Sequence, residues 1–251
     1  MTCLELDRDA PRRRPEGVRP AGYQRWTNLL FAHYRLAAET VRALVPSELE
    51  LDLWDGDAFV GIVPFEMHDI RLAWQPRIFG LDFLETNLRT YVHHRGEPGV
   101  FFFSLEASSR LAVEAARAGW GLPYHLASMS TARDGDWIDY ASTRRATRHS
   151  RASAGAHFRA RYRAGAALET SQPGSLEFFL LERYYLFANQ RGRTMKGHVH
   201  HVPYPAFSAE AGAFETTLLE AAGLPAPRGR PATLHFSPGV DVEVFGPWAV
   251  S

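Results

Sequence analysis

The chain has 251 residues, of which 45% are hydrophobic and 22% are charged, values typical of a folded globular protein. Its formal net charge at pH 7 is zero, which disfavours nucleic acid as a partner because no overall positive charge holds a phosphate backbone. The single cysteine, Cys3, excludes an intrachain disulfide and a cysteine-based metal cage, and it is consistent with a reducing compartment.

Residues 1–22 are charged and rich in proline, so we expect a flexible N-terminal arm ahead of a single domain over residues 23–251. The arm lacks the apolar stretch of a signal peptide, and no later segment offers about 18 uninterrupted apolar residues. We therefore expect a cytoplasmic protein without a membrane partner. Neither an internal repeat nor a shift in composition indicates a second domain.

The first half of this domain is predicted to contain more strand than helix. Alternation and a β-branched or aromatic composition predict strands over residues 26–34, 49–54, 58–65, 83–92 and 100–106. Helices are predicted over residues 37–44 and 110–118, the second capped by Ser108 or Ser109. The glycine-rich turn at residues 96–99 implies that the last two strands form an antiparallel pair.

The second half begins with three short strand-like segments, which together suggest a meander. They cover residues 125–131, 137–143 and 156–162. Residues 175–187 follow a Pro-Gly turn and have the pattern of an amphipathic helix with an unusually wide apolar face. We expect this helix to pack against a sheet. Strands over residues 196–204 and 233–237 and a helix over residues 214–222 complete the prediction.

The strand predicted over residues 83–92 carries the most informative polar pattern. Because side chains alternate along a strand, Glu85, Asn87 and Arg89 share one face. Phe83 and Tyr91 lie on that same face. Alternation alone leaves two interpretations open. In the first, the opposite apolar face packs on the core and the charged face meets water. In the second, the polar face lines the interior of a barrel and forms a ligand site.

Other familiar chemistries find little support in the sequence. His198 and His200, in a cluster with His201, would share a strand face and offer a pair of metal ligands. Because no carboxylate or third ligand is placed beside them, ordinary strand or surface histidines are the favoured interpretation. Neither a glycine-rich phosphate loop nor a Gly-x-Ser-x-Gly nucleophile elbow occurs. We expect neither a metal nor a cofactor.

A set of short motifs is spread over the chain from about residue 23 to residue 248. They are Trp26 with Leu29-Leu30-Phe31, Val63-Pro64-Phe65, residues 87–92, Phe103-Ser104-Leu105, Leu122-Pro123-Tyr124, Glu182-Arg183-Tyr184 and residues 237–241. Together they resemble the YqjF-like, DUF2071 family of the acetoacetate decarboxylase-like superfamily. The combination is specific for a fold, whereas each motif alone is weak.

The resemblance implies an α+β fold, mainly antiparallel β, in which a cone-shaped β-barrel with flanking helices encloses a central cavity. The decarboxylase of this superfamily forms a Schiff base through a lysine that follows the proline of a tight turn. Here Tyr124 and His125 stand at the two corresponding lysine positions. Lys196, the only lysine, lies elsewhere and is expected at the surface. Decarboxylation through a Schiff base is therefore not expected.

Four residues are candidates for catalysis under this resemblance. Glu85 matches a cavity glutamate of the decarboxylase and would act as an acid or base. Arg89 would bind a carboxylate or enolate through two hydrogen bonds. Tyr124 would donate to a developing oxyanion, and His125 would enter the cavity beside it.

Three further residues are predicted to bind the ligand. They are Asn87, Arg25 and Tyr91, with Arg25 as a substitute for an early cavity arginine of the family. An alternative stays open, in which Glu85, Asn87 and Arg89 only satisfy one another inside the barrel.

Two functional classes follow from this site. The first is an enzyme that acts on a small keto or carboxylic acid by proton transfer without a Schiff-base lysine, in the manner of a lyase, isomerase or cyclase. The second is a non-catalytic protein that binds a small organic acid or an apolar metabolite. In both the partner is a small molecule, and a homo-oligomer is compatible with either.

Overall fold

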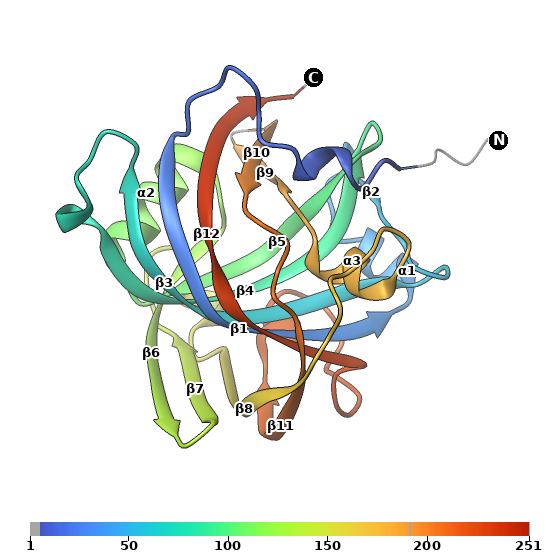
Figure 1. The fold of residues 1–251 in the computed structure, drawn as a ribbon. Helices are drawn as coiled ribbons and strands as arrows, with labels where there is room; N and C mark the ends of the chain where they lie inside the picture. The colour runs from blue at the N-terminus through green and yellow to red at the C-terminus, as the bar shows by residue number, and fades with distance from the viewer. Residues whose placement is uncertain (1–5, 191, 251) are drawn as a thin grey trace.

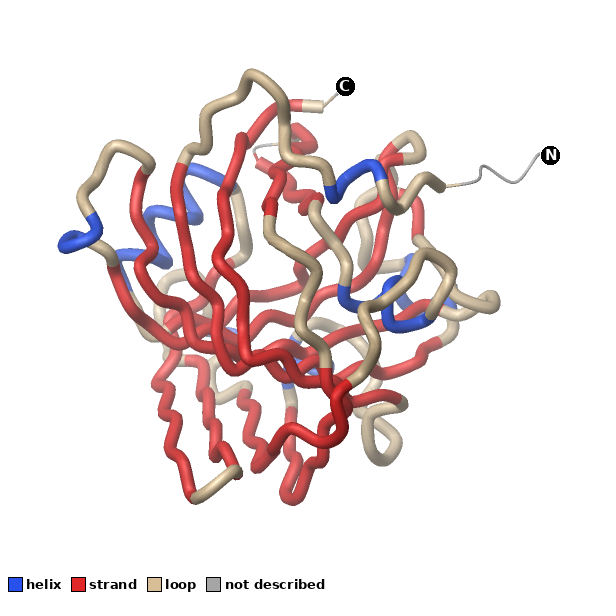
Figure 2. Tube along the Cα trace, viewed as in Figure 1, coloured by secondary structure: helices blue, strands red, loops and turns tan. Residues whose placement is uncertain are grey.

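The computed structural model of the protein describes residues 6–190 and 192–250. Its strands form one hydrogen-bonded sheet, with short helices at its margins (Figures 1 and 2). The strands are β1 (Gly22–Leu36), β2 (Glu50–Leu51), β3 (Ala58–Leu72), β4 (Leu81–His94), β5 (Glu97–Ala107), β6 (Tyr124–Asp134), β7 (Trp137–Arg144), β8 (His157–Ala167), β9 (Tyr185–Gln190), β10 (Arg193–His200), β11 (Phe207–Thr216) and β12 (Thr233–Ala249). The α-helices are α1 (Ala38–Arg42), α2 (Arg110–Trp120), α3 (Leu176–Leu181) and α4 (Leu218–Ala221).

The sheet divides at β5 and at β12, and it therefore closes on itself twice. One edge of β5 pairs with β4, while its other edge pairs first with β9 and then with β6, both in parallel. Strand β12 pairs with β1 on one side and with β11 and β10 on the other. Strands β12, β1, β3, β4 and β5 are thus shared by two rings. We call the ring completed by β9 and β10 the first ring, and the ring completed by β6, β7, β8 and β11 the second ring.

Because β4 belongs to both rings, both of its faces are buried. Glu85, Asn87 and Arg89 point to the interior of the first ring, while Thr86 and Leu88 point to the second. The second ring is packed with aromatic and aliphatic side chains, and the strands that complete it, β6, β7, β8 and β11, lie at the bottom of the view in Figure 1. The interpretation in which the charged face of this strand meets water is therefore wrong.

Several local predictions are confirmed. Strands β4 and β5 form the expected antiparallel pair, and β6, β7 and β8 form the expected meander. Helix α2 begins after Ser109, whose side chain accepts a hydrogen bond from the Ala112 amide. It ends at Gly121, which has a φ of 68°, the left-handed conformation that glycine adopts without strain.

Two helix predictions are wrong in extent. The helix expected over residues 175–187 ends at Leu181, and residues from Tyr185 onward form strand β9. Residues 178–181 are all fully buried, and a continuous apolar run does not distinguish a buried helix from a buried strand. Similarly, the helix expected over residues 214–222 is shorter: residues 214–216 form the end of β11, and only Leu218–Ala221 is helical, as α4.

The described part of the N-terminal segment, residues 6–21, lies against the first ring. Pro11 is buried within a short 3-10 helix. A ring nitrogen of His198 lies 2.8 Å from the carbonyl oxygen of Pro11, and one of His200 lies 3.1 Å from that of Arg12. Arg8 forms an ion pair with the buried Asp52. None of the described helices is both long and apolar enough to cross a bilayer.

Candidate functional site

A cavity of about 580 Å³ occupies the interior of the first ring. Side chains from β1, β3, β4, β5, β6, β9, β10, β12 and α2 line it, and most of them are apolar. Every second residue of β4 contributes, from Leu81 through Glu85 to Arg89. The predicted cavity face of this strand is therefore present, since alternation brings its polar side chains into one enclosed space.

Glu85 and Tyr124 are joined across the cavity wall. The hydroxyl group of Tyr124 donates a 2.7 Å hydrogen bond to Oε2 of Glu85, and only 3% of the Glu85 surface is exposed. Burial raises the pKa of Glu85 to about 8, and the charge of Glu106 adds to this effect, while the bond from Tyr124 opposes it. Burial, together with Glu85, raises the pKa of Tyr124 as well. Glu85 is thus a buried carboxyl group that ionises less readily than a carboxyl group in water.

Arg89 lies in the cavity wall without a carboxylate partner among the described residues. Its Nη2 donates to the carbonyl oxygen of Leu180 at 3.2 Å, and its Nε is buried without a hydrogen-bond partner. The guanidinium lies 5.5 Å from the centre of the Phe31 ring and 5.8 Å from that of Tyr91. The alternative in which Glu85 and Arg89 pair with each other is not observed. Instead, Arg89 is a buried guanidinium group that no carboxylate among the described residues neutralises.

Arg183 is a second cavity arginine, supplied by the connection between α3 and β9. Its Nη1 forms a 2.6 Å ion pair with Asp52, and its Nε donates to the carbonyl oxygen of Phe179. Its Nη2 is buried without a partner. Asp52 also binds Arg8, so one buried carboxylate joins the N-terminal segment to the cavity wall. The Arg183 guanidinium lies 4.8 Å from the centre of the Tyr91 ring.

Two other polar groups face the same region. Asn87 is buried on β4, and its Oδ1 has no hydrogen-bond partner. Tyr204 lines the cavity, and its backbone amide donates a 3.0 Å hydrogen bond to Glu182. Buried polar atoms are normally paired, so the unpaired Oδ1 of Asn87 is an exception within the cavity wall.

Three of the predicted site residues are not part of the cavity wall. His125 follows Tyr124 at the start of β6, so alternation turns its imidazole to the opposite face, where burial and the charges of Arg144 and Arg117 lower its pKa to about 3. Arg25 points outward and pairs with Asp241 at 2.6 Å. Tyr91 lies behind the wall, and its hydroxyl donates to the carbonyl oxygen of Leu180 at 2.7 Å.

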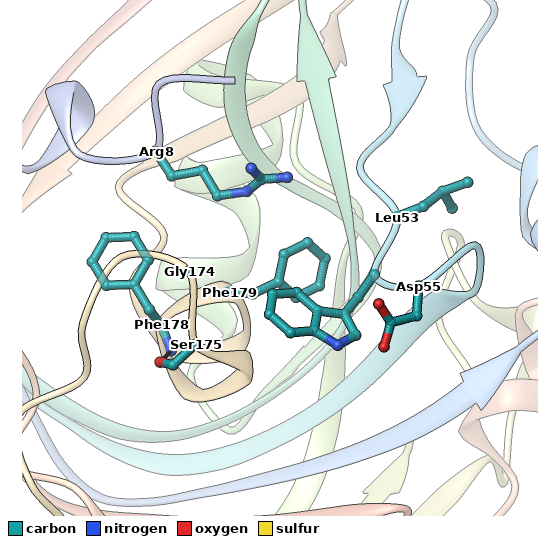
Figure 3. Close-up of a pocket in the computed structure, with 8 residues that line it drawn as sticks. Arg8, Leu53, Asp55, Gly174, Ser175, Phe178 and Phe179 are labelled. Carbon is teal, nitrogen blue, oxygen red and sulfur yellow. Dashed lines mark hydrogen bonds between the residues drawn. The ribbon is translucent and has the colours of Figure 1, made fainter. Parts of the chain in front are cut away.

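A smaller cavity of about 250 Å³ lies beside α3 (Figure 3). Arg8 reaches over it from the N-terminal segment, and its guanidinium lies 5.6 Å from the centre of the Phe179 ring. Trp54 packs on the same ring at 5.4 Å. This smaller cavity is therefore next to the Asp52 ion pairs that hold Arg183.

Arg183 and Tyr204 are cavity residues that the sequence analysis did not predict as part of the site. Arg183 belongs to a motif used for the family resemblance, but the predicted helix over residues 175–187 hid its position. The available signal was an arginine that stands between two apolar segments of the sequence. Such a position implies burial, and a buried charged side chain usually has a specific partner.

The histidine cluster and the lysine are placed outside the cavity wall. His198 and His200 contact backbone carbonyl oxygens of the N-terminal segment, and His201 stacks on Tyr184 with ring centres 4.6 Å apart. The described residues contain no group of three or more metal-ligating side chains. Lys196 pairs with Glu97 at 2.7 Å.

The fold is that of the acetoacetate decarboxylase-like proteins. Acetoacetate decarboxylase from Legionella pneumophila is similar over 100% of this chain and 98% of its own, with a TM-score of 0.62 and 17% identity. The enduracididine biosynthesis enzyme MppR, complexed with the condensation product of pyruvate and imidazole 4-carboxaldehyde, gives a TM-score of 0.62 and 14% identity. It covers 93% of this chain and 91% of its own. At these identities the similarity concerns the fold alone.

The sequence comparisons define the family within this fold. The model of DUF2071, described as "Uncharacterized conserved protein", matches residues 23–241. The "Uncharacterized protein YqjF" of Bacillus subtilis (strain 168) is 40% identical over 220 residues, which are 87% of this chain and 88% of that protein. The chain belongs to the DUF2071 family, as its motifs predicted.

Proposed function

We propose that the protein is an enzyme that binds a keto or carboxylic acid in the large cavity and transfers a proton at Glu85. The observation that carries this proposal is that the positive and the acidic side chain of the cavity wall do not pair with each other. Arg89 is a buried cation without a carboxylate partner among the described residues, while the nearby carboxyl group of Glu85 is bound to Tyr124. An acid ligand would supply the missing negative charge.

The chemistry follows from these two groups. The ligand carboxylate accepts hydrogen bonds from Arg89, with Arg183 as a further donor. The ionised form of Glu85 takes a proton from the carbon next to a carbonyl group. Once Glu85 carries that proton, the hydroxyl group of Tyr124 turns from Glu85 and donates to the carbonyl oxygen, where negative charge has developed. Protonated Glu85 then returns the proton to the same or a neighbouring carbon, so that atoms and charge balance.

A Schiff-base route has no support from the lining of the cavity. The only lysine of the chain, Lys196, is bound to Glu97 and is not among the residues that line the cavity. The names of structural relatives with this fold refer to acetoacetate and pyruvate, which makes keto acids the first compounds to test.

The test measures binding and proton exchange separately. Keto acids are incubated with the protein in deuterated water, and the exchange of the hydrogen next to the carbonyl group is followed by NMR. We expect exchange with the wild type, and a loss of at least 100-fold in Glu85→Gln, because this variant keeps the shape but cannot accept the proton. Borohydride trapping with the same acids should leave Lys196 unmodified.

Arg89→Met is the matched variant for binding. It should weaken acid binding about 10- to 100-fold in calorimetry, because a hydrogen bond to a charged group contributes about 1.5–3 kcal/mol. Its Tm should be equal to or above that of the wild type, since an apolar side chain replaces a buried cation. Unchanged affinity of Arg89→Met would contradict the proposed binding mode.

The mostly apolar lining favours a second candidate function, a binding protein without catalysis. Under this alternative, acids would raise the Tm of both the wild type and Glu85→Gln equally, and neither protein would exchange the hydrogen. That pair of results would replace the proposed enzyme by a carrier of organic acids.

A further inference from the structure

The large cavity is much bigger than a three- or four-carbon acid requires. Its 580 Å³ would hold roughly twenty water-sized volumes, whereas pyruvate has only six non-hydrogen atoms. Cavities of about 300–1,000 Å³ usually hold drug-sized ligands. A small keto acid would therefore leave most of the apolar wall facing empty space or disordered water.

Strand β4 gives the direction and length of this cavity. The lining residues along it run from Leu81, which is 37% exposed, through Phe83, Glu85 and Asn87 to Arg89, which is 8% exposed. Because a strand rises about 3.3 Å per residue, the Cα atoms of Leu81 and Arg89 are roughly 26 Å apart. Glu85 lies about midway. The anion-binding end is thus the deep end of an elongated space.

The opening of the cavity is apolar. Its exposed large apolar lining residues are Leu72 at the end of β3, Leu81 at the start of β4 and Leu111 on α2. Trp74 and Ile78, on the connection between β3 and β4, are 77% and 85% exposed. The exposed leucines of the lining make the opening apolar, which favours the entry of an apolar group.

The polar side chains near the opening already have partners. Gln75 accepts a hydrogen bond from the amide of Leu72, and Gln24 accepts one from the indole of Trp26. Arg71 pairs with Asp69 at 3.0 Å. In contrast, the unpaired polar atoms, Nε of Arg89, Nη2 of Arg183 and Oδ1 of Asn87, belong to the inner part of the lining.

We propose that the ligand is an amphipathic monocarboxylic acid, with a carboxylate bound at Arg89 and an apolar chain or ring system that extends along β4 to the opening. This inference rests on the proposed function and specifies its substrate class. It places the carboxylate at the deep end of the cavity, beside Arg89, and the apolar part of the ligand between Glu85 and the opening.

Chain length is the variable that tests this inference. We propose to measure Kd by calorimetry for butanoate, hexanoate, octanoate and decanoate, each below its micelle concentration, with 1-decanol as the probe that lacks the carboxylate. Each added methylene group should lower Kd roughly three- to fourfold, as expected for burial of a methylene. The series therefore spans at least two orders of magnitude, and 1-decanol should bind at least tenfold more weakly than decanoate.

A pair of variants on α2 provides the structural control. Ala116 lines the cavity, whereas Ala118 on the same helix is exposed and is not among the lining residues. Ala116→Phe should weaken decanoate at least tenfold and leave butanoate within twofold, and Ala118→Phe should change neither. Ala115→Phe, at an exposed lining position, serves in place of Ala116→Phe should the latter lower the Tm strongly.

The outcomes separate this inference from the proposed function. A Kd that does not depend on chain length, together with a loss of binding in Arg89→Met, would overturn the amphipathic ligand and keep the acid site. If 1-decanol and decanoate bind with the same Kd, and if Arg89→Met changes neither Kd, the acid site itself would be overturned. Failure of all four acids to bind would overturn both.

Discussion

Burial raises the pKa of Glu85 to about 8 from an ordinary value of 4.5, so the folded protein holds a proton that the unfolded chain releases. This difference links folding to pH. The folded state binds more protons than the unfolded state between these two values, so the stability contributed by the neutral carboxyl is complete below about pH 4.5 and is lost as pH rises through about 8.

The pH dependence gives a prediction for one residue. Between about pH 5 and 8, the free energy of unfolding of the wild type should fall relative to that of Glu85→Gln, with a slope approaching 1.4 kcal/mol per pH unit. Urea titrations at several pH values measure this slope difference. Glu169→Gln, at an exposed position, is the control and should follow the wild type. Parallel curves for wild type and Glu85→Gln would show that Glu85 is not protonated on folding.

Single-residue predictions from alternation succeeded only within an uninterrupted strand. Alternation placed Glu85, Asn87 and Arg89 together correctly, but the family resemblance was needed to place them inside. Strand β1 shows the limit, because Asn28 has a φ of 55° and the pairing with β3 shifts register around it. The lining residues of β1 are Gly22, Gln24 and Trp26 before this irregularity and Leu29 and Phe31 after it. Arg25 alternates with Gln24 and Trp26 and so points outward, but alternation alone does not tell which of the two faces of β1 lines the cavity.

At the level of elements, helix and strand were distinguished where local capping or turn residues marked a boundary. Helix α2 begins after Ser109, whose side chain caps its first turn, and ends at Gly121, which adopts the left-handed conformation. The apolar run through α3 and β9 contains no such mark, so the change from helix to strand near Arg183 depends on tertiary contacts. The ion pair of Arg183 with Asp52, which are 131 residues apart, is such a contact.

The cap of α2 leads to a prediction for this element, which borders the cavity opening. Ser109→Ala should reduce the free energy of unfolding by about 1 kcal/mol, because the Ala112 amide loses its acceptor. Ser109→Asp should retain most of the stability, since its carboxylate accepts the same bond. Chemical denaturation measures both. Ser47→Ala, at an exposed position, should lie within about 0.5 kcal/mol of the wild type.

At the level of the whole molecule, the sequence predicted a barrel through family resemblance but not its division into two rings. That division depends on β5 and β12 each pairing with three neighbours, and pairings between distant segments leave no local mark in the sequence. It also explains why the polar face of β4 is buried even though its other face already packs on a core.

The N-terminal segment contacts both the strands of the first ring and the ion pairs that hold Arg183 in the cavity wall. Removal of residues 1–14 deletes the partners of His198 and His200 and the Arg8 ion pair with Asp52. We expect a loss of about 2 kcal/mol, or a fall in Tm of roughly 4–8 °C, together with weaker acid binding because Arg183 depends on Asp52. Differential scanning calorimetry and acid titration measure the two effects. Arg13→Ala, at an exposed position, is the control, and an unchanged Tm of the truncated protein would contradict this role.

Closure of both rings also governs how one copy of the protein can meet another. Among the described strands, every member of the two rings has neighbours on both sides, and only the two-residue β2 borders a single strand. Open strand edges are the usual template for continuing a sheet from one molecule into the next. Within the described residues, the outer parts of β6 and β11 keep such edges, because residues 127–134 of β6 pair only with β7 and residues 209–216 of β11 pair only with β8. An oligomer that continued the sheet could therefore form there.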